Sequence, residues 1–324
     1  MKKAFVVTAA LALLSMGGIA QANITIDTVA VGNAGNAADT TGYGAVAYNY
    51  NIGKNDVTTG QYTAFLNAVA ATDTYGLYNT GMAGTNAAPT YGCGITQSGV
   101  SGSYTYSAAD PNLPVINVSY WSACAFANWI NNGQLGAGTT QTGAYTLTAS
   151  GEANNTITRN VGATWAVANE NEWYKAAYYD PTLNGGVGGY WTYATQSNTD
   201  PTASLPTSAP NSSNSADSNS IPAVGTTTDV GVYTGSASYY GTFDQNGNVF
   251  NWNESISGTN HAIRGGNFAC PAVLEASSFG DIYIPASGGY GTGFRLVQAV
   301  PEPSSIVALL GGLVSLLGIR RRKA

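Results

Sequence analysis

The feature that most limits the fold of this chain is its small supply of regular structure. Three short segments, beginning near Thr58, Ser119 and Asn169, each combine a helix N-cap residue with apolar residues at helical spacing. Between them, residues 133–160 and 195–228 are rich in Gly, Thr, Asn and Ser, which predicts irregular surface loops or short hairpins. No fixed-period repeat is visible. We therefore expect one α+β domain with few regular elements and long loops.

The N-terminal end has the layout of a secretory signal peptide. Two lysines follow Met1, an apolar stretch follows them, and Ala20-Gln21-Ala22 forms a small-x-small cleavage site. We predict that signal peptidase cuts after Ala22, so that residues 1–22 are a signal peptide and the domain spans residues 23–299. An uncleaved anchor helix is the alternative, although the stretch is short for a membrane span.

The C-terminal end, residues 300–324, combines Pro301-Glu302-Pro303, an apolar run to Ile319 and a basic end. As a helix the run would cover roughly 24 Å, a little less than the ~30 Å hydrocarbon core of a bilayer. Its basic end should stay cytoplasmic, which leaves the domain outside. The three parts in this order resemble the PEP-CTERM sorting signal.

That resemblance implies export by a Gram-negative bacterium, in which an exosortase cuts near the Pro-Glu-Pro motif. The C-terminal helix would be a transient inner-membrane anchor and the only contact with a membrane. The processed protein would then be secreted, or held at the cell surface or in the extracellular matrix. A plain tail anchor is the alternative interpretation.

Charge is scarce and unevenly placed along the chain. Six of the 11 Lys and Arg lie in the two terminal signals. The domain between them therefore has five cationic residues and 16 of the 17 Asp and Glu. An acidic domain without clustered basic residues argues against a nucleic-acid partner or an anionic-membrane surface. The single histidine, His261, argues against a metal site built on several histidines.

Six short strings, in order along residues 29–298, resemble motifs of the formylglycine-generating enzyme family, also called the sulfatase-modifying factor domain. The strings are Ile52–Tyr62, Leu113–Tyr120, Trp165–Tyr174, Asp244–Trp252, Arg264–Phe268 and Gly293–Arg295. The fourth is similar to the family's D-x-x-G-N-V-W-E-W and the fifth to its R-G-G-S-W. The resemblance implies the family's compact α+β fold, which is poor in regular structure and distantly like C-type lectins.

The resemblance also implies a chemistry, which the residues match only in part. The family's oxidases convert a substrate cysteine into formylglycine, using O₂ and a copper(I) ion held by two cysteines, the second five residues after the first. Cys270 matches the first cysteine, and Glu275 stands at the second position. A carboxylate is a poor substitute for the soft thiolate that suits Cu(I). We therefore expect no copper, with Cys270 as a remnant of the catalytic pair. A relative of the family that binds non-haem iron needs several histidines, which this chain lacks.

The three cysteines of an exported protein predict one disulfide and one free thiol. We expect Cys93 to pair with Cys124, because Cys270 occupies the family's active-site position. A plain buried thiol at Cys124 is the alternative, since this residue lies among apolar positions of the second predicted helix.

Calcium is a better fit than copper to the residues present. The family binds Ca²⁺ in its D-x-x-G-N-V-W-E-W string, which implies as ligands the side chains of Asp244 and Asn251 and the carbonyls of Gly247 and Val249. Asn251 replaces the family's usual glutamate, which should weaken the site. A second calcium site would fall in the loop 214–219, with Asp217 as the best candidate. An ordinary Asn/Gly turn before a core strand is the alternative to the first site.

Some motif residues have a structural explanation. The bulky apolar residues of the motifs are expected in the core: Trp173, Trp252 and Phe294. We expect Arg264 and Arg295 to be buried and to tie loops to carboxylates such as Glu172 or Glu254.

Three classes of function remain open. The favoured one is a non-catalytic surface or matrix protein that binds a glycan or a peptide with its Tyr-, Trp- and Asn-rich surface. The second is an active copper-dependent formylglycine-generating oxidase that modifies a cysteine of sulfatases or other proteins, which needs a second thiolate near Cys270. The third is another kind of enzyme that uses acids such as Glu172 and Glu254, although nothing in the sequence marks these two as a pair.

Overall fold

The computed structural model describes residues 23–88 and 90–300. The predicted signal peptide and the Pro-Glu-Pro motif of the predicted sorting signal lie outside these residues. Within the described ranges, no helix is long and apolar enough to cross a membrane.

Short helices are spread along the domain. They are α1 (Thr59–Val69), α2 (Tyr120–Asn131), α3 (Ala149–Ala153), α4 (Glu170–Tyr178) and α5 (Leu183–Gly186), with 3-10 turns η1 (Thr80–Ala83) and η2 (Ala272–Glu275). Helices α1, α2 and α4 begin directly after Thr58, Ser119 and Asn169, which confirms the three predicted starts. Thr58 and Asn169 each form a capping box with the residue three positions later, so both helices have satisfied first turns.

The strands are short and form several small sheets. They are β1 (Thr28–Val31), β2 (Tyr50–Gly53), β3 (Ile95–Ser98), β4 (Thr105–Ala108), β5 (Trp165–Val167), β6 (Tyr179–Asp180), β7 (Gly189–Tyr190), β8 (Thr202–Ala203), β9 (Ser212–Ser213), β10 (Phe250–Ser257), β11 (Asn260–Arg264), β12 (Asp281–Tyr283), β13 (Thr292–Gly293) and β14 (Leu296–Ala299). Two sheets have four strands, in the orders β1-β2-β14-β5 and β12-β11-β10-β13. The first is antiparallel throughout, and β13 pairs in parallel with β10 in the second.

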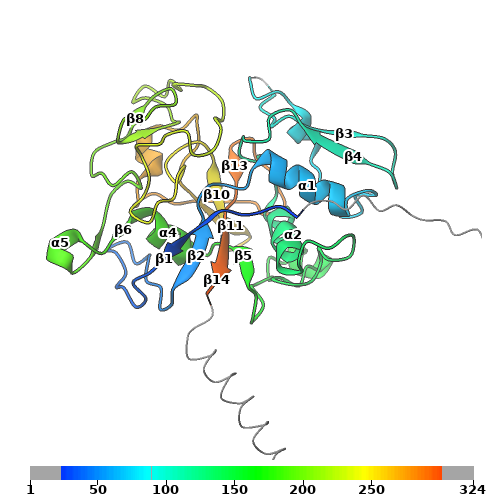
Figure 1. The fold of residues 1–324 in the computed structure, drawn as a ribbon, viewed down its shortest axis with the longest axis horizontal. Helices are drawn as coiled ribbons and strands as arrows, with labels where there is room; N and C mark the ends of the chain where they lie inside the picture. The colour runs from blue at the N-terminus through cyan, green and yellow to red at the C-terminus, as the bar shows by residue number, and fades with distance from the viewer. Residues whose placement is uncertain (1–22, 89, 301–324) are drawn as a thin grey trace, which may run out of the picture.

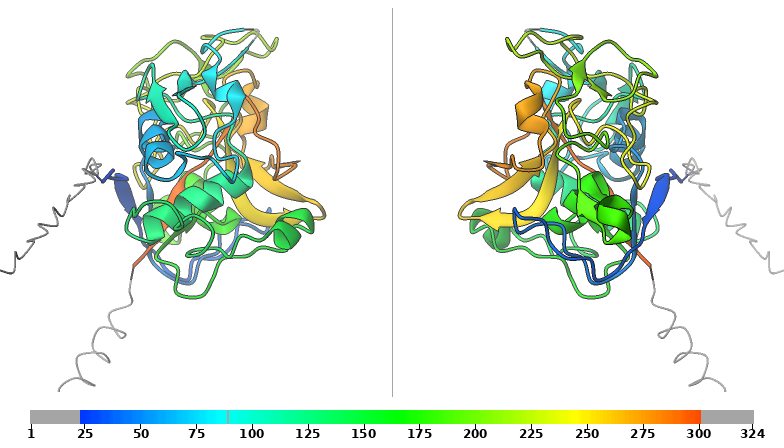
Figure 2. Two further views of the ribbon diagram at one scale, coloured as in Figure 1. Left: turned by 90° about the vertical axis from the view of Figure 1, so that its right-hand side faces the viewer. Right: turned by 90° about the vertical axis from the view of Figure 1, so that its left-hand side faces the viewer.

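The first four-stranded sheet brings the two ends of the domain together. Strand β14, next to the end of the described chain, lies between β2 and β5. Figure 1 shows this sheet near the centre of the view, with α1 and α2 to its right and α4 to its left. Figure 2 shows the β10–β11 hairpin of the second sheet curving outward at one side of the domain.

Large aromatic side chains fill the core between these elements. Trp173, Trp252 and Phe294 are fully buried, as predicted. Phe294 packs on Tyr62 and Phe126, with ring centroids 6.5 and 5.4 Å apart. The core therefore links the closing G-F-R string to helices α1 and α2.

The predicted loop regions contain little regular structure, with small exceptions. Residues 133–160 include the single-turn helix α3, which Thr148 caps through a hydrogen bond to Gly151 N–H. Residues 195–228 include the two-residue strands β8 and β9, which pair in parallel. These elements are too short to leave a periodic signal in the sequence.

Candidate functional site

A tight turn after β11 leads the chain from the second sheet to Cys270 and to the 3-10 turn η2, which contains Glu275. Gly265 and Gly266 adopt positive φ angles of 102° and 72°. A Cβ atom on Gly266 would lie 2.8 Å from Cγ of Glu275, and one on Gly265 would lie 3.1 Å from the ring of Trp173. Both glycines are therefore needed for the backbone conformation, and they leave space for Trp173 at Gly265 and for Glu275 at Gly266.

Glu275 is fully buried in this site. Its Oε1 atom accepts a hydrogen bond from the Ser213 hydroxyl at 3.3 Å, while Oε2 has no partner in the described part of the chain. Burial raises the pKa of Glu275 to about 8, so the side chain is mainly a neutral acid at pH 7. Its backbone carbonyl is held by Tyr178 and Asn246, which fixes η2 against α4.

Cys270 is partly buried, and burial raises its pKa above the ordinary thiol value. Its backbone is fixed by hydrogen bonds to Asn267 and Ala216. A protonated thiol beside a neutral carboxylic acid is not a copper(I) site, because Cu(I) prefers two thiolates. The residues present therefore do not fit the metal that the family's oxidases use.

The predicted Cys93–Cys124 disulfide is wrong, because both residues are free thiols in separate surroundings. The Cys93 thiol points to the Ile116 carbonyl at 3.8 Å, and the Cys124 thiol, on the buried face of α2, interacts with Tyr120. Both thiols are buried. Burial raises the pKa of each thiol, so they act as small apolar residues.

A shallow cleft of about 180 Å³ lies beside the R-G-G-N turn. Its walls include Asn267 from the turn, Tyr283 of β12, and Tyr290 from the loop before β13. Tyr283 and Tyr290 are 41% and 50% exposed, and Tyr290 stacks on Tyr91 with ring centroids 5.1 Å apart. These tyrosines could not be predicted as site residues, because Tyr283 ends a three-residue strand and Tyr290 lies in a Gly-rich loop, both outside the motif strings.

The predicted first calcium site is occupied by hydrogen bonds within the protein. Asn251 Oδ1 accepts from Trp173 Nε1 at 2.8 Å and from Arg295 Nε at 3.2 Å, and Asn251 Nδ2 donates to the Val249 carbonyl at 3.4 Å. Asp244 Oδ2 accepts a hydrogen bond from Gly231 N–H at 2.6 Å. With its oxygens engaged in this way, the arrangement does not fit a calcium ion at Asn251.

Burial raises the pKa of Asp244 to about 7, and the nearby carboxylate of Asp56 adds to the rise. Gly247 forms an isolated parallel β-bridge with Asn214. This bridge connects the turn to the second predicted calcium segment. The turn before β10 is thus a hydrogen-bonded structural element.

In the second predicted segment, the notable residue is Asn214 and not Asp217. The amide nitrogen of Asn214 faces three oxygens, those of the Thr226 carbonyl at 2.8 Å, the Asn248 side chain at 3.1 Å and the Thr228 hydroxyl at 3.5 Å. Its Oδ1 atom is buried and has no partner in the described residues. These three acceptors fit the amide nitrogen, and a hard cation at this point would require the amide to flip so that its oxygen joins them as a fourth oxygen ligand.

Asp217 is exposed, and it accepts hydrogen bonds from the backbone of Ile221 and Asn219 at 2.9 and 2.8 Å. These bonds lower its pKa. Asp217 therefore closes a surface turn.

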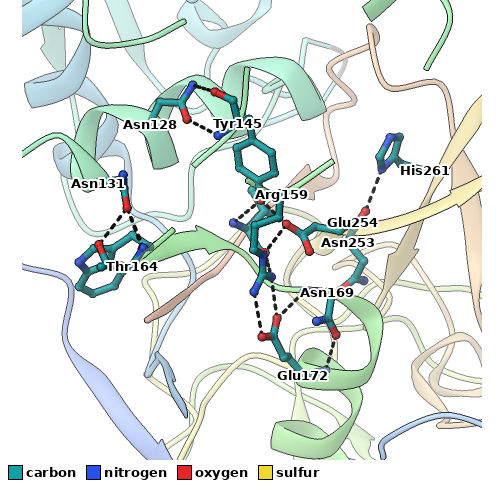
Figure 3. Close-up of polar contacts among 12 residues, drawn as sticks. Asn128, Asn131, Tyr145, Arg159, Thr164, Asn169, Glu172, Asn253, Glu254 and His261 are labelled. Carbon is teal, nitrogen blue, oxygen red and sulfur yellow. Dashed lines mark hydrogen bonds and ion pairs between the residues drawn. The ribbon is translucent and has the colours of Figure 1, made fainter. Parts of the chain in front are cut away.

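Glu172 and Glu254, the two acids considered for another kind of enzyme, are joined by an arginine (Figure 3). Arg159 bonds Glu172 through Nη2 and Glu254 through Nε, each at 2.8 Å. One guanidinium, with a single positive charge, pairs with both carboxylates, so the three side chains form a structural ion-pair cluster. The prediction that Arg264 and Arg295 contact these acids is wrong.

Arg264 and Arg295 are buried, as expected, but they have other partners. Arg264 pairs with Glu170 at 2.7 Å and Arg295 with Asp56 at 3.0 Å. Each arginine thus holds a motif string to a neighbouring element.

His261 is a core residue without a catalytic partner. Its two ring nitrogens contact the Asn253 carbonyl at 3.1 Å and Asn155 Oδ1 at 2.8 Å, and its ring stacks on Tyr120 (Figure 3 shows the Asn253 contact). Burial lowers the pKa of His261 to about 4, so the imidazole is neutral at physiological pH.

Most of the chain matches one known protein family. Residues 26–300 match the sequence profile of the sulfatase-modifying factor enzyme 1-like domain. Among solved structures, the chain is similar to CarF, with 21% identity and a TM-score of 0.55 over 86% of this chain and 99% of CarF. This similarity confirms the predicted α+β fold. A comparison with curated proteins found no match to the chain.

Two other structures show weaker similarity. Treponema denticola variable protein 1 has 17% identity and a TM-score of 0.49, over 84% of this chain and 94% of that protein. PvdO from Pseudomonas aeruginosa has 15% identity and a TM-score of 0.44, over 85% and 91%.

Proposed function

This chain belongs to the sulfatase-modifying factor enzyme 1-like family, and from that premise we propose that it binds ligands without the oxidase activity of its family. The observation that carries the proposal is the burial of Glu275. A neutral, fully buried acid stands where the oxidases have their second thiolate. The other two thiols are buried elsewhere in the core, so neither supports Cys270.

The binding surface in this proposal is the cleft lined by Asn267, Tyr283 and Tyr290. Exposed tyrosines offer large contact areas with few rotatable bonds, and the asparagine amide can donate and accept hydrogen bonds. These groups suit the apolar faces and polar edges of a glycan or an extended peptide.

The place of action follows from the terminal signals of the sequence. We propose that signal peptidase removes residues 1–22 and that an exosortase processes the chain near Pro301-Glu302-Pro303. The acidic, lysine-poor domain is then secreted or displayed at the surface or in the matrix of a Gram-negative bacterium.

A copper-loaded turnover assay tests the loss of oxidase activity. We expect the purified protein, reconstituted with Cu(I), to produce no formylglycine from a Cys-x-Pro-x-Arg peptide, as read by mass spectrometry. The variant Glu275→Cys should gain Cu(I) binding at least a hundredfold over the wild type in competition with a chelator, because it restores two thiols at the family spacing.

Glu275→Gln is the matched control and should bind no better than the wild type. Formylglycine made by the wild type and lost in Cys270→Ser would reverse the proposal.

The binding role is tested with arrays of glycans and peptides. A ligand that binds equally well to the double variant Tyr283→Ser, Tyr290→Ser would place binding outside the cleft.

We also propose that a calcium ion stabilises the loop around Asn214. At a calcium concentration about 100-fold above Kd, binding contributes about 2.7 kcal/mol, which raises Tm by several degrees. We expect this rise in the wild type and in Asp217→Asn, and its loss in Asn214→Ala, measured as the difference in Tm between calcium and excess EDTA. Equal Tm values for the wild type in both buffers would contradict the calcium site.

A further inference from the structure

A second cavity, of about 250 Å³, opens at the N-terminal end of α2 and shares no lining residue with the cleft beside the R-G-G-N turn. Four segments that are distant in sequence form it. Its polar and aromatic walls come from Tyr75, Ser119, Trp121, Ser122, Gln141 and Glu152.

Hydrogen bonds hold each wall of this pocket in place. The Asp73 carboxylate accepts from the backbone of Leu77 at 2.8 Å and fixes the loop that carries Tyr75. Ser119 caps α2, and the Gln141 carbonyl accepts from Leu147 N–H at 2.8 Å. The pocket is therefore preformed, as small-molecule sites usually are.

Glu152 is the one charged side chain that lines the pocket. Its carboxylate makes no ion pair or hydrogen bond within residues 23–88 and 90–300. Burial raises its pKa, and no protein cation opposes that effect. An uncompensated carboxylate in a concave, partly desolvated site attracts a cation from solution.

Aromatic rings complete the surroundings of this carboxylate. Trp121 is only 7% exposed, with its ring packed edge-on against His261 at 5.6 Å, so its position is fixed. Tyr75 is 57% exposed at the mouth. Aromatic rings that line the same pocket as a carboxylate favour organic ammonium groups over hydrated metal ions, because cation–π attraction adds to the charge pairing.

We propose that this pocket binds a small organic ammonium ion, with the Glu152 carboxylate as its counter-ion and Trp121 and Tyr75 in contact with its apolar part. Ser119, Ser122 and Gln141 provide oxygens for the N–H groups of a primary ammonium. The site is independent of Cys270 and of the proposed binding cleft, so either proposal can fail without the other.

Isothermal titration of the purified full-length protein tests the site with choline and n-butylammonium as probes. 3,3-Dimethylbutan-1-ol, the neutral isostere of choline, is the matched ligand control. We expect at least one of the two cations to bind tenfold or more tightly than the neutral alcohol. A preference for choline indicates a quaternary ligand, and a preference for n-butylammonium a primary one.

Glu152→Gln should weaken cation binding at least tenfold, and Trp121→Leu should weaken choline more than n-butylammonium. Asp281→Asn, which removes an exposed charge elsewhere, should have no effect. Equal binding of choline and its isostere, unchanged binding by Glu152→Gln, or no binding of either cation would overturn the proposal. A neutral sugar that binds the wild type and Glu152→Gln equally would also overturn it.

Discussion

Replacing Glu275 with glutamine should raise the free energy of unfolding at pH 8 by roughly 4–5 kcal/mol and change it little below pH 4.5. Burial raises the pKa of Glu275 from 4.5 to about 8. Between pH 4.5 and about pH 8, the Glu275 side chain loses its proton in the unfolded chain but keeps it in the folded protein. The wild type therefore loses about 1.4 kcal/mol of stability per pH unit across this window because of Glu275.

Glutamine resembles the neutral acid in shape and cannot ionise, so it removes this pH dependence. Urea unfolding of both proteins from pH 4 to pH 8.5 measures the difference. Asp281→Asn, at an exposed position, is the control and should follow the wild-type profile. If the gap between Glu275→Gln and the wild type stays constant from pH 5 to pH 8, Glu275 is not a buried neutral acid.

Replacing Arg295 with methionine should cost about 3–5 kcal/mol, a large part of the stability of an ordinary domain. Arg295 donates to the carbonyls of Gly53, Lys54 and Phe243 at 2.8, 3.0 and 2.7 Å, and to Asp56 at 3.0 Å. Its side chain and that of Asp56 are fully buried. Methionine fills similar space but leaves these acceptors without donors.

The measurement is urea unfolding at one pH. The exposed Lys54→Met, which also removes one cation, should change stability by less than about 1 kcal/mol. Adding Asp56→Asn to Arg295→Met should recover part of the loss, since it removes the unpaired buried acid. A loss below about 1 kcal/mol for Arg295→Met alone would show that water replaces the guanidinium at little cost.

The parts of the fold that follow local rules could be predicted from the sequence. Thr58, Ser119 and Asn169 begin helices because their side chains satisfy the first free N–H groups, which depends on neighbouring residues only. The aromatic residues of the motifs belong in the core for their apolar area alone. The sheet order, with β14 beside β2, depends on pairing across the whole chain and left no local signal.

The site was predicted less completely, because its contacts are long-range. Arg159 joins Glu172 to Glu254 from a loop that belongs to none of the motif strings. The unpartnered oxygen of Asn214 depends on Thr226 and Asn248, which approach it only in the folded chain. The disulfide prediction failed because counting cysteines gives no information about which thiols meet.

The place of β14 between β2 and β5 also affects how the protein is made. Its residues, Leu296–Ala299, leave the ribosome after nearly the whole domain during synthesis. Until they arrive, β2 and β5 have no shared partner and the first sheet cannot close. Closure of the first sheet is therefore a late event of folding, and the unpaired edges of β2 and β5 stay open to other strands until then.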